Sequence, residues 1–178
     1  MKRSLFLAIG IFSLLLMSTN QGFSQMDKTK RASPPMTVTG TVKDASININ
    51  YSSPSVKGRK IWGDLVPYGK VWRTGANEAT IFETDKAIKV EGKELAAGKY
   101  SLYTIPGEKE WVIIFNSQVG QWGITRTGET TEDPAKDVLR VTVKSDGSKE
   151  FNEQFRIAIE KKEIVIYWEN LKVPVEIK

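Results

Sequence analysis

The sequence of 178 residues contains no histidine and no cysteine. Without these side chains the chain cannot build a Ser-His-Asp or Cys-His nucleophile system, thiol redox chemistry, or the usual zinc, copper and haem sites. Any catalysis would have to use carboxylates, lysine, tyrosine, serine or threonine, or a hard metal on oxygen ligands. We therefore assign no catalytic residue and expect neither a metal site nor a cofactor.

Long hydrophobic runs are also missing, except near the N-terminus. Lys2 and Arg3 precede an apolar run from Leu5 to Met17, and a polar stretch with small residues follows, which is the pattern of an export signal. The run is short for a membrane-spanning helix, which needs about 20 apolar residues. We expect a signal peptide over residues 1–24, cleaved before Gln25, with a retained N-terminal anchor as the alternative.

Positive charge is only slightly in excess in the part of the chain that is expected to fold. The net charge is +5 for the whole sequence, but it is about +1 for residues 37–178 once the charges up to Arg31 are set aside. A nucleic-acid-binding domain would carry a clustered basic face, so no nucleic-acid partner is expected. Because no cysteine is present to carry a lipid, we expect a periplasmic or secreted protein without a transmembrane segment after signal cleavage.

Apolar and polar residues alternate with period two through most of the remaining chain, as in "TVTGTV", "ININY" and "KYSLYTI". This alternation is typical of half-buried strands, and no stretch keeps a helical period for more than about two turns. We predict an all-β fold, an antiparallel β-sandwich or barrel-like sheet pair of roughly ten short strands. It should occupy residues 37–178 as a single domain, after a flexible polar leader over residues 25–36.

Two segments refine the predicted sheet. The nearly continuous apolar run Trp111–Phe115, "WVIIF", predicts a strand that is buried on both faces. Residues 151–178 are interpreted as a closing meander of three strands, in which Pro174 marks the last as an edge strand or a bulged one. Trp111 and Trp168 lie in apolar contexts and are expected in the core.

The segment Leu65–Thr80, "LVPYGKVWRTGANEAT", places two aromatic residues, an arginine, an asparagine and a glutamate around a Gly-Ala pair. We interpret "VWRT" as a strand that Gly75-Ala76 breaks, with Asn77 and Glu78 at the following turn. Arginine and asparagine could orient polar groups of a ligand while an aromatic ring stacks on its apolar face. The candidate ligand-binding residues are Tyr68, Trp72, Arg73, Asn77, Glu78 and Trp122.

Three functions remain open at this point. A non-enzymatic envelope module would bind a small polar ligand, a glycan or a protein partner through these residues. A small hydrolase or isomerase would instead use carboxylates, for which Asp64, Glu78 and Glu83 are the available members near the segment. In a purely structural or assembly protein, Arg73 would form an ion pair with Glu78 or Glu83 that locks the loop.

Three long motifs resemble one bacterial family. They are "GRKIWGDLVPYGKVWRTGANEATIFET", "GKELAAGKYSLYTIPGEKEWVIIFN" and "QWG". The chain closely resembles domain of unknown function 2911, a Bacteroidetes-type family, from about Val56 to the C-terminus, most specifically between Gly58 and Gly123. The resemblance implies an exported, single-domain β-protein, and it carries no catalytic or binding residues over to this chain.

Overall fold

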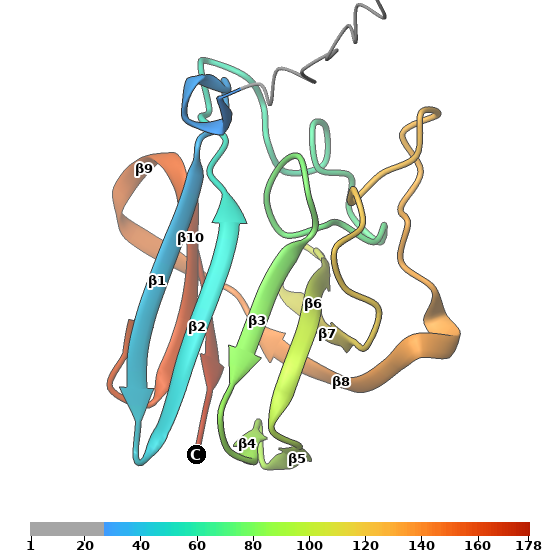
Figure 1. Ribbon diagram of the computed structural model, residues 1–178. Helices are drawn as coiled ribbons and strands as arrows, with labels where there is room; N and C mark the ends of the chain where they lie inside the picture. The colour runs from blue at the N-terminus through green and yellow to red at the C-terminus, as the bar shows by residue number, and fades with distance from the viewer. Residues whose placement is uncertain (1–26) are drawn as a thin grey trace, which may run out of the picture.

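A six-stranded antiparallel sheet forms the main layer of the protein, seen in Figure 1, the computed structural model. The structure describes residues 27–178, and the expected signal peptide over residues 1–24 lies outside them. The strand order is β1-β2-β3-β6-β7-β8. These strands are β1 (Pro35–Val42), β2 (Ala45–Ser52), β3 (Thr80–Thr84), β6 (Gly98–Ile105), β7 (Glu110–Asn116) and β8 (Asp137–Lys144).

The remaining strands form two hairpins. β9 (Asp146–Glu160) and β10 (Glu163–Glu176) make a long hairpin that lies behind β1 and β2 in Figure 1. The short hairpin of β4 (Ile88–Val90) and β5 (Lys93–Leu95) lies at the lower end of the molecule in Figure 1, near the C-terminus. The long loops between strands lie at the upper end.

The predicted all-β class is confirmed. Within residues 27–178 there are ten strands and no α-helix, and the helical content is two short 3-10 turns, η1 (Lys28–Lys30) and η2 (Pro134–Lys136). No helix in this range is long and apolar enough to cross a bilayer.

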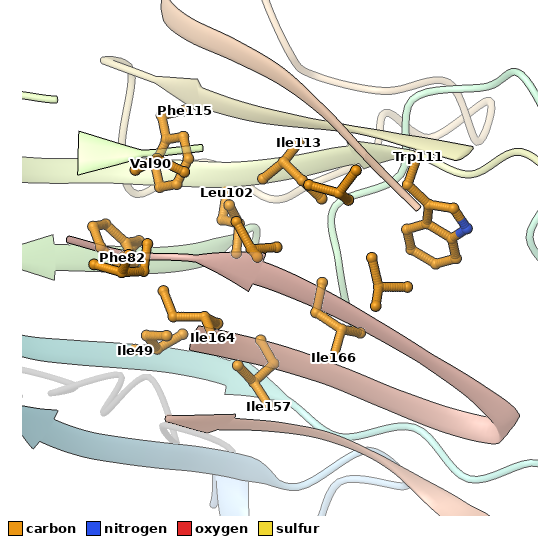
Figure 2. Close-up of a cluster of buried hydrophobic side chains, with 14 of the residues drawn as sticks. Ile49, Phe82, Val90, Leu102, Trp111, Ile113, Phe115, Ile157, Ile164 and Ile166 are labelled. Carbon is orange, nitrogen blue, oxygen red and sulfur yellow. The ribbon is translucent and has the colours of Figure 1, made fainter. Parts of the chain in front are cut away.

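The core lies between the six-stranded sheet and the β9–β10 hairpin (Figure 2). The alternation of apolar and polar residues in the sequence explains this core. Every second residue of a strand faces the same side, so the apolar residues of each strand gather on one face. Ile49 and Phe82 reach into the core from the sheet, and Ile157 and Ile166 meet them from the hairpin. All four are at most 3% exposed, and each contributes about 1.5–3 kcal/mol by leaving water.

Strand β7 is buried on both faces, as the run "WVIIF" predicted. Trp111 and Phe115 belong to the main core, whereas Ile114 packs with Ala79 and Tyr103 in a second cluster. The loop after β7 reaches this second cluster, where Gln121 Nε2 donates a hydrogen bond of 2.8 Å to the Tyr103 hydroxyl.

The closing meander of three strands was predicted wrongly. The chain forms two long strands, and the third expected strand is the continuation of β10, which contains Pro174. The polar residues after Trp168 look like a turn in sequence, but Glu169 adopts a left-handed φ of 56° and the register of β10 shifts on either side of it. The chain therefore makes a bulge there and continues in the same strand.

The N-terminal part of the described chain is ordered further upstream than the expected domain start at Thr37. β1 begins at Pro35, which pairs with Ser52, and the amide of Ser53 donates to the carbonyl of Pro34 at 2.9 Å. Sequence composition missed this because the segment has few apolar residues. Its contacts are hydrogen bonds and ion pairs to distant parts of the chain.

Candidate functional site

A long loop over residues 53–79 joins the adjacent strands β2 and β3 at the loop end of the sheet, uppermost in Figure 1. Its main anchor to the sheet is Trp72, whose amide donates to the carbonyl of Thr104 at 2.7 Å and whose carbonyl accepts from the Thr104 amide at 2.9 Å. This is an isolated bridge, so the strand expected over "VWRT" is not formed.

The expected break after "VWRT" is a tight turn. Thr74 and Asn77 both adopt left-handed backbone conformations, with φ of 54° and 60°. The hydroxyl of Thr80 donates to the carbonyl of Thr74 at 2.7 Å and closes the turn. A side chain at Gly75 would place its Cβ 2.8 Å from the Ser52 carbonyl oxygen, so only glycine fits this close approach.

Under the turn, four tryptophans pack against one another. Trp62 lies edge-on to Trp111 at 5.1 Å between ring centroids, and Trp72 stacks on Trp168 at 5.8 Å with an interplanar angle of 13°. Trp111 and Trp168 are 0% and 1% exposed, as predicted for core residues. The indole N–H of Trp72 donates to the carbonyl of Gly75 at 3.1 Å, so this ring fixes the turn from below.

Arg73 follows directly and is partly buried. Its Nε is buried and has no hydrogen-bond partner among residues 27–178. Burial lowers the pKa of the Arg73 guanidinium from its ordinary value, and the nearby Tyr103 opposes this only in part. A buried donor without an acceptor costs about 1–3 kcal/mol, and more when it is charged.

The alternative of a structural ion pair between Arg73 and Glu78 or Glu83 is wrong for the described chain. Glu78 is paired with residues of the N-terminal segment, and Glu83 lies 3.2 Å from the Nζ of Lys99. No salt bridge joins Arg73 to a carboxylate anywhere in residues 27–178. Arg73 is therefore a partly buried cation without an ionic partner from the part of the chain that is described.

A pocket of about 310 Å³ lies beside Arg73, and we call it the two-arginine pocket. Its polar walls include Arg59, Arg73 and Asn77, and its aromatic wall includes the stacked rings of Trp72 and Trp168. Within residues 27–178, no aspartate or glutamate lines it. The pocket thus combines two cations with an apolar surface.

Glu78 does not line the two-arginine pocket. Its carboxylate accepts a hydrogen bond of 2.8 Å from Arg31 and lies 3.0 Å from the Nζ of Lys28. Partial burial raises its pKa, but hydrogen bonds from the backbone, Lys28 and Arg31 outweigh this effect, and the net result is a lowered pKa. Glu78 is therefore an ionised anchor for the N-terminal segment.

Trp122 and Asn77 contact the same N-terminal segment. The Arg31 guanidinium lies 5.7 Å from the centroid of the Trp122 ring, which is otherwise 48% exposed. The side-chain Nδ2 of Asn77 donates to the carbonyl of Ser33 at 3.1 Å, and Ser33 also lines the two-arginine pocket. Asn77 therefore links the pocket to the N-terminal segment.

Tyr68 stands apart from the other candidates. It is 40% exposed, and its ring packs on Gly63. Burial and the charges of Glu108 and Glu169 raise its pKa, and it does not line the two-arginine pocket. The structure therefore brings Trp72, Arg73 and Asn77 together, groups Glu78 with Trp122, and leaves Tyr68 outside both groups.

Two parts of the pocket were missed in the sequence. Arg59 precedes Arg73 in the same long loop, and only the fold of that loop brings the two to one pocket. Trp168 was assigned to the core alone, although it also forms part of the pocket wall. The surplus of arginine over acid in the segment Gly58–Arg73 is the one signal that could have pointed to Arg59.

The carboxylates that were considered for catalysis are not arranged as an acid–base pair. Asp64 is exposed, and Glu78 and Glu83 are each held by basic residues. Elsewhere, Glu132 and Asp137 have side chains only 3% and 9% exposed, and both pair with Arg140. No cluster of three or more metal-binding side chains occurs in the described part of the chain.

The ion pairs of Glu78 predict a specific pH dependence. Because folding lowers the pKa of Glu78 below its ordinary 4.5, its contribution to stability is present above that value and is lost as pH falls through the lowered pKa. Glu78→Gln should lower the free energy of unfolding by about 0.5–1 kcal/mol at neutral pH, a value typical of a solvent-accessible pair. Urea unfolding should show this gap closing between about pH 5 and pH 3.

The matched control for this experiment is Glu83→Gln. The Glu83–Lys99 pair is more exposed on both sides than the Glu78–Arg31 pair, and Glu83 has no second cation within residues 27–178, so its removal should change stability less. A Glu78→Gln gap that stays constant into acid would show that the ion pairs do not carry the effect.

The comparisons with known proteins gave one match. The family described as "Protein of unknown function (DUF2911)" matches residues 33–177. No curated protein and no solved structure matches the chain. The match covers nearly all of the ten-stranded domain, including both arginines of the pocket. The chain therefore belongs to the DUF2911 family.

Proposed function

We propose that this protein is a non-enzymatic binding module of the cell envelope, and that the two-arginine pocket is its ligand site. The observation that carries the proposal is Arg73, a partly buried cation that lines the pocket and has no ionic partner among residues 27–178. A cation held in this way is destabilising for the empty protein, since its desolvation is not offset by an ion pair. A ligand that brings a negative charge or hydrogen-bond acceptors to the Arg73 guanidinium would recover that loss.

The two other functions have less support. An enzyme that used Glu78 as a general acid would need a raised pKa, whereas the pKa of Glu78 is lowered by its hydrogen-bond partners. A purely structural role for Arg73 would require a partner for its charge, and Glu78 and Glu83 are occupied by other cations. Both arguments favour ligand binding.

Arg73→Met tests the proposal, because methionine keeps most of the apolar stem and removes the charge. We expect the free energy of unfolding to stay unchanged or to rise by up to about 1 kcal/mol, as when a binding residue is held at the expense of stability. A thermal-shift screen of the purified protein with sugars, small carboxylates and divalent cations should find a stabilising compound, since a ligand of the native state raises the melting temperature. That shift should vanish in Arg73→Met.

Arg140→Met is the matched control, because Arg140 does have carboxylate partners. Removing it leaves Glu132 and Asp137, both nearly buried, without their cation, and should destabilise the protein by about 1–3 kcal/mol. A loss of similar size in Arg73→Met, with no compound shifting the wild type, would assign Arg73 to the scaffold and overturn the proposal.

A further inference from the structure

The charge balance of the two-arginine pocket defines what it can hold. Arg59 donates from Nε to the carbonyl of Val56 at 3.1 Å and from a terminal nitrogen to the carbonyl of Ser55. These bonds fix the guanidinium in place, but neutral carbonyls leave its charge uncompensated. Arg59 and Arg73 form no salt bridge with any carboxylate of residues 27–178. Two positive charges therefore share one pocket without a counter-charge from the described chain.

The donors available in the pocket favour a planar anion. Guanidinium groups bind carboxylates through two parallel N–H···O bonds, which match in geometry and in charge. Arg73 lines the pocket and forms no salt bridge with a carboxylate of residues 27–178, so its guanidinium can take up such an anion. A sugar hydroxyl could accept one hydrogen bond, but it would leave both charges uncompensated.

The apolar wall indicates the rest of the ligand. Trp72 is partly exposed and Leu65 is 45% exposed, and both line the pocket, whereas Trp168 stacks behind Trp72 and is 1% exposed. Flat rings pack well against such aromatic walls. The volume of about 310 Å³ lies at the small end of ligand pockets, which fits a molecule with a single ring.

We infer that the two-arginine pocket binds a small organic carboxylate with a flat apolar body, its carboxylate on Arg59 and Arg73 and its body against Trp72 and Leu65. This assignment rests on the proposed function, because it names the ligand class of the same site.

Phenylacetate and its uncharged counterpart phenylacetamide test the inference as a matched pair of probes. Binding is followed by NMR on the ¹⁵N-labelled protein through the indole N–H signals of Trp72 and Trp168, assigned with Trp→Phe variants. We expect phenylacetate to shift these signals and phenylacetamide to bind at least ~10-fold more weakly at equal ionic strength, because it lacks the charged acceptor. Arg73→Met should abolish the response and Arg59→Met should weaken it.

Arg156→Met is the control for an unspecific loss of positive charge, since Arg156 stacks on Tyr167 at 3.6 Å and does not line the pocket. It should leave phenylacetate binding unchanged. Acetate and inorganic phosphate, which lack the flat body, should each bind more weakly than phenylacetate.

Each other result has a definite meaning. An equal response to phenylacetate and phenylacetamide would overturn the anion assignment, while the pocket would still bind a ligand. Acetate or phosphate binding as tightly as phenylacetate would overturn the role of the aromatic wall. If no probe shifts either indole N–H signal, the inference is wrong. In that case, sugars or cations that stabilise the wild type but not Arg73→Met would leave the proposed function standing alone.

Discussion

Replacing Trp111 with alanine should lower the free energy of unfolding by about 3–5 kcal/mol, the largest effect we expect for a single substitution in this protein. Trp111 is 0% exposed and lies at the start of β7, where it packs on Trp62 and Trp72 at centroid distances of 5.1 and 6.3 Å. Alanine would leave a cavity under the loop that carries Arg73, and the surrounding rings are too rigid to fill it.

Trp111→Phe separates packing from hydrogen bonding at the same site. The indole N–H of Trp111 is buried and has no acceptor among the described residues, so phenylalanine removes an unsatisfied donor along with part of the ring. We expect a clearly smaller loss than for alanine. Urea unfolding followed by far-UV circular dichroism measures both variants without relying on tryptophan fluorescence.

Trp122→Ala is the matched control for Trp111→Ala. Its side chain is 48% exposed, and its main recorded partner is the Arg31 guanidinium at 5.7 Å, a contact worth about 0.5–1 kcal/mol at an exposed site. Equal losses of unfolding free energy in the two alanine variants would contradict the conclusion that the buried tryptophan cluster stabilises the loop over residues 53–79.

The sequence predicted well those features that local alternation determines. The period of two identified the strands, and the run "WVIIF" identified the strand that is buried on both faces. Trp111 and Trp168 were predicted in the core because their neighbours are apolar. These features depend on which face each residue presents, and that follows from the sequence alone.

The sequence failed where partners come from distant parts of the chain. Glu78 was considered as a partner of Arg73, five residues away, but it binds Lys28 and Arg31, which a prediction from composition treated as a flexible leader. Likewise, Arg59 could not be joined to Arg73, because the loop between them has no periodic pattern from which its path could be predicted. Ion pairs have no period, so they cannot be read from alternation.

Gly123→Ala should disturb the candidate site through a clash with Arg73. A Cβ on Gly123 would lie 2.4 Å from the Cβ of Arg73 and 2.3 Å from its Cδ, far inside normal contact. The Cβ of Arg73 belongs to a backbone that is fixed by the neighbouring bridge of Trp72 to Thr104, so it cannot yield. We expect a loss of about 1–3 kcal/mol in the free energy of unfolding, together with loss of the phenylacetate response, because Arg73 must move.

Gly147→Ala is the matched control for Gly123→Ala. No heavy atom lies within 4 Å of a Cβ at Gly147, so the same change of residue should alter stability by at most about 0.5 kcal/mol and leave probe binding intact. In the double variant with Arg73→Ala, the loss should be smaller than the sum of the single losses, because the clash with Cδ is gone while that with Cβ remains. Additive losses, or a Gly123→Ala variant that binds phenylacetate as the wild type does, would show that the position of Arg73 does not depend on Gly123.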